Sequence, residues 1–519
     1  MKILLIDPPF YIFTGYIDRW FSPGLASIGA VLRQNGHEVI ICQTDLIKKH
    51  FDVNFNSEYL QLKHYIDCLN NKDHWVWKEI LEIIAQIKPD LVGLTALTMK
   101  FGSVVRVSQI IKEYNPQIPV IIGGPHASSW PKLSLSVDSI DYCLAGEAED
   151  SIVEFISALE SRDPNAMDKV PGLSFRSGSG LILKGPGPVP RNLDRLPLVS
   201  RDLLMFPRAY SAEDMGLLLT TRGCPYHCTF CSHERSVRFR SIDNVMHEIS
   251  HVIETYGTRQ FAFKDDSFSI KRKRTVEFCN RLIKEGFDIN WEITTRVNLV
   301  DEELLDLMVR AGLNIMKIGV ESGSERILKQ IEKTTTMKQM RQVARLFNKN
   351  GLFWSGYFMY GLPDENEEDM KATYRFMREL NPMYAGLGLY APMPDTPLWQ
   401  QGVEMGLVIS DDELSIEHFF TTNPKDYFFK DPEKRVQAVS PHRFKKLGKL
   451  LAAKFNRHNT NIFNLIRRAI ARKKIYLDNP LLFIRDVNKG LKWAFPSWIE
   501  KSVETGRKHF HDLWKTEIS

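Results

Sequence analysis

Residues 220–231 read Thr-Thr-Arg-Gly-Cys-Pro-Tyr-His-Cys-Thr-Phe-Cys, which places Cys224, Cys228 and Cys231 on one short loop. Thiolates are favoured ligands of iron–sulfur clusters. Three of them can hold three irons of a 4Fe–4S cluster and leave the fourth iron open. The alternatives are a disulfide pair and a zinc site, but zinc usually takes four ligands from two separated pairs. The sequence has no second Cys/His pair with that spacing, so it predicts a cluster.

Around this loop, apolar runs alternate with amphipathic stretches. Short apolar runs predict six strands at residues 217–221, 260–264, 288–294, 315–320, 353–360 and 385–390. Helical patterns separate them, for example at residues 301–311 and 337–350. Six such units predict a partial, open (β/α)6 barrel of the TIM type, whose chemistry lies at the carboxyl ends of the strands. The cysteine loop follows the first of these strands.

The N-terminal third has the same alternation. Buried parallel strands are predicted at residues 2–6, 38–42, 91–94, 119–122 and 141–144, and helices at 23–35, 75–87, 102–114 and 149–159. This order predicts a doubly wound, Rossmann-like α/β domain. Its ligand should lie over the carboxyl ends of the strands, at residues 7–13, 95–99, 123–128 and 146–149.

We therefore predict an α/β chain with four parts. Residues 1–155 form the doubly wound domain, and residues 156–210 form a Gly- and Pro-rich linker with room for one small hairpin. Residues 211–430 form the barrel, and residues 431–519 form a basic, helical C-terminal region.

The composition is that of an ordinary globular protein, with 43% apolar and 25% charged residues among 519. Seven cysteines in this length do not indicate a disulfide framework, and thiols that bind iron need a reducing compartment. The apolar run at the N-terminus is too short for a signal peptide, and no stretch approaches the ~20 apolar residues of a membrane span. We expect a cytoplasmic protein.

The charge is concentrated in the tail. Residues 442–519 contain 18 Lys and Arg against 6 Asp and Glu, a net charge of +12, whereas the whole chain carries +5. One interpretation is a solvated helical cap on the barrel. The other is contact with an amphiphilic substrate or an anionic membrane, which would place the protein peripherally at the inner membrane surface. No motif supports binding to nucleic acid, and none is expected.

The cysteine loop, with the aromatic Phe230 before its last cysteine, resembles the signature of the radical S-adenosylmethionine (SAM) enzymes. The resemblance implies that SAM chelates the open iron and that Phe230 lies at this cofactor site. It implies that an electron from the cluster breaks the sulfonium bond to give a 5′-deoxyadenosyl radical. An external electron donor such as flavodoxin or ferredoxin is implied as well.

Other strand ends resemble the SAM-binding positions of this family. Asp265 and Asp266 follow the second barrel strand and are candidates for the SAM amino group or the substrate. Arg296 follows the third strand and could pair with the SAM carboxylate as a fork-shaped donor. At the ends of the fourth and fifth strands, the resemblance assigns ribose contacts to Glu321 and Ser322 and an adenine-facing turn to Gly361.

The N-terminal domain resembles the cobalamin-binding domain that is fused to one branch of radical SAM enzymes. The matching segments are residues 93–98, 123–128 and 145–149. They supply the candidate cobalamin-binding residues Thr95, Thr98, Gly123, Gly124, Ser128, Gly146 and Glu147. The alternative is a nucleotide-binding or empty Rossmann-like domain, which the absence of G-x-G-x-x-G after the first strand and of a P-loop disfavours.

The sequence departs from cobalamin proteins that coordinate cobalt through histidine. Their Asp-x-His-x-x-Gly loop corresponds here to Asp7-Pro-Pro-Phe-Tyr-Ile, which has no histidine. We therefore expect cobalamin without a protein imidazole on cobalt. His126 follows a different strand and is predicted to be a loop residue.

Together these resemblances imply a cobalamin-dependent radical SAM methyltransferase, which methylates an unactivated carbon of a small-molecule or lipid-like substrate through a 5′-deoxyadenosyl radical and methylcobalamin. The alternative enzyme keeps the three cofactors, the 4Fe–4S cluster, SAM and cobalamin, but performs an oxidative cyclisation or ring rearrangement. A third hypothesis is a cobalamin-binding sensor without catalysis. The intact cysteine triad weighs against the sensor.

Overall fold

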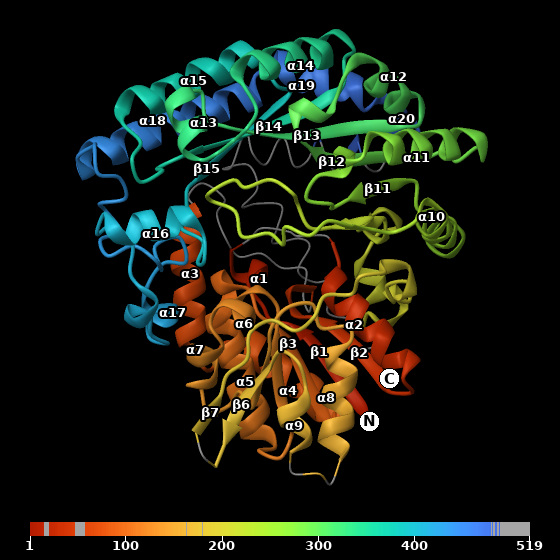
Figure 1. Cartoon of the computed structure of the whole chain (residues 1–519), viewed down its shortest axis with the longest axis vertical. Helices are drawn as coiled ribbons and strands as arrows, with labels where there is room; N and C mark the ends of the chain where they lie inside the picture. Colours follow the sequence, from red (N-terminus) through yellow and green to blue (C-terminus); the bar gives the residue numbers. More distant parts are fainter. Residues whose placement is uncertain are drawn as a thin grey trace.

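The computed structural model describes residues 1–14, 20–46 and 58–478, except 162, 164 and 179, together with residues 480, 483, 484 and 487. Within them lie two large sheets, one above the other in Figure 1. The red-to-orange half is the lower part of the view, and the green-to-blue half is the upper part.

The first sheet has seven strands in the order β2-β1-β3-β4-β5-β6-β7. The five predicted strands are parallel and are confirmed as β1 (Lys2–Asp7), β2 (Glu38–Gln43), β3 (Leu91–Thr95), β4 (Val120–Gly123) and β5 (Tyr142–Leu144). The antiparallel hairpin β6 (Leu173–Ser177) and β7 (Gly180–Ile182) extends the sheet. This hairpin falls in the segment predicted as a linker.

Helices cover both faces of the first sheet, because alternate residues of each strand point to opposite sides. In β1, Leu4 and Ile6 belong to the core under α3 (Glu58–Asn70), α4 (Trp75–Ile87) and α5 (Phe101–Tyr114). Ile3 and Leu5 belong to the core under α2 (Pro23–Gln34) and α8 (Ser151–Glu160). The doubly wound prediction is therefore confirmed, with α3 as an additional helix.

The second sheet has six parallel strands in the order β15-β14-β13-β12-β11-β8. They are β8 (Leu217–Leu218), β11 (Gln260–Phe263), β12 (Asn290–Thr295), β13 (Leu313–Glu321), β14 (Phe353–Tyr360) and β15 (Tyr384–Leu389). The connecting helices are α10 (Ile242–Tyr256), α11 (Arg272–Lys284), α12 (Glu302–Arg310), α13 (Glu325–Gln330), α14 (Met337–Lys349) and α15 (Glu367–Leu380). Figure 1 shows α12, α14 and α15 on its outer side, as in the predicted partial (β/α)6 barrel.

The chain returns from the barrel to the first half. Trp399 in α16 (Pro397–Glu404), Phe419 in α17 (His418–Thr421) and Tyr427 belong to the same hydrophobic core as α3, α4 and α5. Figure 1 shows α16 and α17 beside α3. The two halves therefore share one continuous core along this side.

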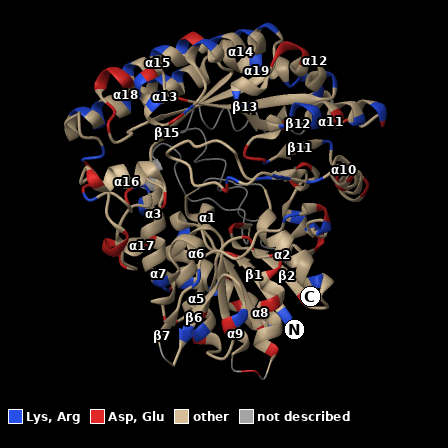
Figure 2. Ribbon diagram, in the orientation of Figure 1, with Lys and Arg blue, Asp and Glu red and all other residues tan. Residues whose placement is uncertain are grey.

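In the part of the C-terminal region that the structure describes, three helices belong to the barrel half: α18 (Pro441–Thr460), α19 (Ile462–Ala471) and α20 (Lys473–Asp478). The Asn459 side chain of α18 accepts a hydrogen bond from Ala385 N and donates one to Ala385 O, both at 2.8 Å, on the outer edge of β15. Figure 2 marks the Lys and Arg positions of these helices in blue. Among the described residues, no helix has both the length and the apolar character needed to cross a bilayer.

Candidate functional site

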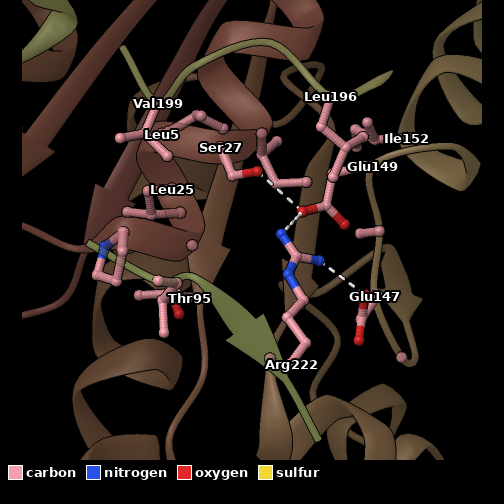
Figure 3. A pocket seen from close by; sticks show the side chains of 18 of the residues that line it. Leu5, Leu25, Ser27, Thr95, Glu147, Glu149, Ile152, Leu196, Val199 and Arg222 are labelled. Carbon is pink, nitrogen blue, oxygen red and sulfur yellow. Dashed lines mark hydrogen bonds and ion pairs between the residues drawn. The ribbon is translucent and has the colours of Figure 1, made fainter. Parts of the chain in front are cut away.

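A cavity of about 600 Å³ runs under α2 and α8 to the carboxyl edge of the first sheet. Its walls are mostly apolar, and its lining includes Leu5, Leu25 and Ile152 (Figure 3). Gly223 and Asp266, from the cysteine loop and the end of β11, line the same cavity. Residues of both halves therefore meet around one space.

Several glycines line this cavity. Gly124 (φ +101°) and Gly146 (φ +88°) adopt backbone conformations that other residues rarely take. A Cβ on Gly93 would lie 2.8 Å from Leu5 Cδ2, whereas one on Gly123 would meet only Leu144 O, at 3.8 Å. Bare backbone at the ends of β4 and β5, above an apolar hollow, fits a bulky ligand such as cobalamin.

The three predicted hydroxyl ligands differ in position. Thr95 lines the cavity. Ser128 Oγ donates to Gly124 O at 3.1 Å and accepts from Gly146 N at 2.9 Å, so it ties two loops together. Thr98 Oγ1 lies 3.2 Å from Nδ1 of His126. Ser128 and Thr98 thus support the walls of the site.

His126 is a core residue of the short helix α6 (Pro125–Ser129). Its side chain is completely buried and stacks on Phe101 with 3.7 Å between the ring centroids. Burial lowers the pKa of His126 to about 3. Asp7, in the loop that lacks the cobalt-binding histidine, forms a buried ion pair with Lys100. Neither feature offers an imidazole to the cavity.

Glu147, predicted as a cofactor contact, lines the cavity and also forms ion pairs with the barrel half. Arg222 Nη1 donates to Glu147 Oε2 and its Nη2 to Glu149 Oε1, both at 2.6 Å (Figure 3). Ser27 Oγ donates to the same Glu149 oxygen at 2.8 Å, and Arg238 also binds Glu147. Burial alone would raise the pKa of Glu147, but the two arginines outweigh it and hold the pKa below its usual value.

The two arginines lie opposite each other on a two-strand ribbon that frames the cysteine loop. β9 (Thr221–Arg222) pairs antiparallel with β10 (Arg238–Phe239). The ribbon therefore connects the loop after β5 directly to the segment that carries Cys224. We call this set of Arg222, Arg238, Glu147 and Glu149 the inter-half clamp.

The cysteine loop itself is fixed by backbone contacts. Gly223 has φ +91°, and a Cβ there would lie 2.6 Å from Ser236 O. Cys224 N donates to Glu234 O at 2.8 Å, and Arg235 donates to Cys231 O at 3.0 Å. All seven cysteines of the chain are free thiols, which removes the disulfide alternative.

Positive groups surround the thiols. Burial alone would raise the pKa of Cys231, but hydrogen bonds from His233 and the charge of Arg235 bring it below the usual value. Burial raises the pKa of Cys224. Arg296 Nη1 lies 3.5 Å from Cys228 Sγ. Cations beside thiols favour the thiolate form that metals require.

No group of three His, Cys, Asp or Glu side chains in the described part of the chain surrounds one point as the ligands of a single metal ion would. The irons of a 4Fe–4S cluster occupy separate corners, so its three thiolates need not converge. The donor set fits such a cluster. Phe230 packs against the barrel core beside the loop.

The adjacent acids Asp265 and Asp266 point to different places. Asp265 is buried and accepts hydrogen bonds from Thr220 N at 2.6 Å and Thr221 N at 3.1 Å, so it anchors the start of the cysteine segment. Asp266 lines the cavity, and its Oδ1 lies 3.3 Å from His233 Nδ1. Of this pair, Asp266 is the one placed for a ligand.

The remaining predicted residues have partners within the barrel. The Arg296 guanidinium lies 3.8 Å from the centroid of Tyr226. Glu321, at φ +66°, accepts from Lys333 Nζ at 2.8 Å. Buried Ser322 contacts Thr373 Oγ1 at 3.2 Å. These contacts arrange the carboxyl ends of β12 and β13.

The turn after β14 contains a residue that the sequence did not single out. Gly361, at φ +86°, donates its N–H to Glu365 Oε2 at 2.5 Å, and Leu362 N donates to the same oxygen at 3.3 Å. Glu365 is completely buried, and burial raises its pKa to about 8. The one feature of the sequence that could have identified Glu365 is its position four residues after Gly361.

Comparisons with known proteins agree with the two halves. The B12 binding domain matches residues 18–156, and the Radical SAM superfamily matches residues 218–377. An uncharacterized methyltransferase of Pyrococcus horikoshii is 31% identical over 456 residues, which cover 86% of this chain and 90% of the relative. The anaerobic magnesium-protoporphyrin IX monomethyl ester cyclase of Rubrivivax gelatinosus is 31% identical, covering 77% and 70%.

A solved structure has the same fold. The radical SAM methyltransferase TsrM from Kitasatospora setae, with cobalamin and a 4Fe–4S cluster bound, gives a TM-score of 0.61 over 87% of this chain and 88% of its own. Its sequence identity is 17%, so the likeness concerns the arrangement of the two halves.

Proposed function

Because the chain belongs to the family of radical SAM enzymes with a B12-binding domain, it is an enzyme that uses a 4Fe–4S cluster, SAM and cobalamin, and we propose that it methylates an unactivated carbon of a lipid-like small molecule. When bound, the cluster and SAM supply a 5′-deoxyadenosyl radical, and cobalamin supplies the methyl group. The observation that carries the proposal is the shared cavity. Gly124 and Gly146 line it from one half, and Gly223 and Asp266 line it from the other.

In this proposal the two halves bind different cofactors. Cys224, Cys228 and Cys231 would hold the cluster. Asp266 and Arg296 would bind the charged amino-acid part of SAM, and Glu321, Ser322 and Gly361 would complete its site. Thr95, Gly123, Gly124 and Gly146 would line the cobalamin site. The inter-half clamp would keep both sites facing one substrate.

The proposed partners follow from the radical chemistry and from charge. The radical chemistry needs electrons, which an external donor such as flavodoxin or ferredoxin would supply. The basic C-terminal region, with its net charge of +12 over residues 442–519, favours an amphiphilic substrate and a peripheral contact with an anionic membrane.

Product analysis tests the methyl transfer. Reduced holoenzyme with SAM and substrate should release both 5′-deoxyadenosine and S-adenosylhomocysteine, because radical initiation and methyl donation each consume a SAM. The product should be heavier than the substrate by one CH₂. Deoxyadenosine without S-adenosylhomocysteine, together with an unmethylated product, would contradict the proposal.

The second candidate is an oxidative cyclisation with the same cofactors. It is favoured by the cyclase relative, whose identity of 31% equals that of the methyltransferase relative. A product that has lost hydrogen and gained no carbon would support it.

A further inference from the structure

The helix α19 exposes its apolar side, whereas an ordinary surface helix packs that side against the protein. Ile462, Phe463, Ile466 and Ile470 are 62%, 73%, 49% and 62% exposed. The spacing of positions 462, 466 and 470 places them on one side of the helix. We call these four residues the α19 apolar face.

The polar residues of α19 point inward instead. Arg467 donates to Asn348 Oδ1 at 2.9 Å, and Asn464 donates to His458 O at 2.9 Å. Arg468 binds Asn459 O. Hydrogen bonds therefore attach the helix to the protein, and its apolar side stays largely exposed among the described residues.

The α19 apolar face lies at the end of the barrel away from the cysteine loop. Ala471 O accepts from Asn314 at the start of β13, and Lys474 forms an ion pair with Asp288, just before β12. Both contacts are at the amino ends of barrel strands, whereas the cysteine loop follows the carboxyl end of β8. A binding partner on this face would not block the shared cavity.

The positive charge around the α19 apolar face indicates which kind of partner binds it. Residues 441–478 contain 11 Lys and Arg and one Asp. A second copy of the chain would bring the same positive charge and repel. Apolar side chains beside many cations suit the interface of an anionic bilayer. The apolar side chains pack among the acyl chains, and the cations bind the anionic headgroups.

We propose that the α19 apolar face inserts into the interfacial region of an anionic membrane and so orients the shared cavity away from the bilayer. The inference rests on the membrane contact proposed above and deepens it by naming the residues that enter the lipid. It implies a fixed attachment point for the enzyme, separate from substrate entry.

Vesicle co-sedimentation tests it with the reconstituted, full-length enzyme. The wild type should bind phosphatidylglycerol-containing vesicles at low salt and should not bind pure phosphatidylcholine vesicles. The double variant Ile466→Asp/Ile470→Asp should bind at least about tenfold more weakly, because two apolar contacts become anionic. The matched control is the double variant Ile283→Asp/Val309→Asp on α11 and α12, whose residues are 45% and 42% exposed. It should bind as the wild type does.

Iron content and cobalamin binding, unchanged in both variants, will show that the fold is kept. Wild-type binding by the double variant would overturn the inference while leaving the broader membrane contact standing. Failure of the wild type to bind anionic vesicles would overturn both. A wild-type dimer that the double variant abolishes, without vesicle binding, would assign the face to a second copy.

Discussion

The two halves of the molecule prepare for their ligands in opposite ways. The first sheet presents a cavity of about 600 Å³ that is lined in part by bare backbone at Gly124 and Gly146. The barrel presents polar side chains that already bond to one another: Thr220 Oγ1 donates to Asp265, and Lys333 Nζ donates to Glu321. One half offers room, and the other offers groups held in place by partners.

Because one site consists of space and the other of positioned groups, the two sites should respond to different changes. A site made of space is lost when the space is filled, even by a small apolar side chain. A site made of positioned groups is lost when a ligand atom is removed or its partner is left alone. The following variants separate the two cases.

The largest effect is expected from the cysteines. Replacing Cys224, Cys228 or Cys231 by Ala should abolish the 4Fe–4S cluster, measured as iron content and absorbance after anaerobic reconstitution, while cobalamin still binds. Cys68→Ala, on α3 and far from the loop in sequence, is the control and should keep its iron. A full cluster in the triple variant would refute the assignment.

Filling the cavity should have the converse effect. Gly123→Leu adds a side chain where a Cβ meets only Leu144 O, at 3.8 Å, so the backbone tolerates it and the cavity receives it. We expect cobalamin affinity to fall at least about tenfold, with iron content unchanged. Gly185→Leu, at an exposed position where a Cβ meets nothing within 4 Å and which is not part of the cavity lining, is the control. Equal cobalamin affinity in Gly123→Leu and wild type would contradict this placement.

The inter-half clamp connects the two kinds of site. Arg222→Gln leaves Glu147 with Arg238 alone and leaves the buried Glu149 without its cation. Removing one partner of a buried pair costs about 3–5 kcal/mol, and since Arg222 is 22% exposed we expect about 2 kcal/mol, read as a lower unfolding midpoint. Arg195→Gln breaks the surface pair with Asp150 and should cost less than about 1 kcal/mol. Equal losses in the two variants would show that the clamp does not couple the halves.

The last effect concerns Glu365 and depends on pH. Its folded pKa of about 8 lies above the ordinary 4.5, so the folded protein keeps a proton that the unfolded chain releases. Stability should therefore fall as pH rises from about 4.5 to about 8. Glu365→Gln removes this slope, so its stability relative to wild type should rise by up to about 4 kcal/mol between pH 4.5 and pH 8. Thermal midpoints at both pH values provide the measurement, and a pH-independent difference would speak against a protonated Glu365.

The sequence predicted the sheets because each buried strand is a short apolar run, and it predicted the cluster loop because three thiols lie within eight residues. It could not separate Asp265 from Asp266. They are neighbours in sequence, and only the position of Thr220 in space shows which one turns away from the cavity.

Contacts between distant residues explain the other differences. Glu147 was expected at the cofactor and lines the cavity, but its ion pair with Arg222, 75 positions along the chain, was not predicted. The tail's charge was visible as composition, whereas the outward direction of Ile466 and Ile470 depends on hydrogen bonds that Arg467 and Asn464 make with other elements. Such contacts leave no periodic signal in the sequence.

The contact between Asn459 and Ala385 has a consequence for the solubility of the enzyme. The outer strand of an open sheet is a template on which another chain can add a strand. The Asn459 amide forms hydrogen bonds with the N–H and C=O of Ala385, as a neighbouring strand would. We therefore expect α18 to block edge-to-edge aggregation at this strand of the barrel. A chain that ends before residue 441 would lack Asn459 and its two hydrogen bonds. If such a chain did not co-sediment with vesicles, the cause would be self-association rather than weaker binding to lipid.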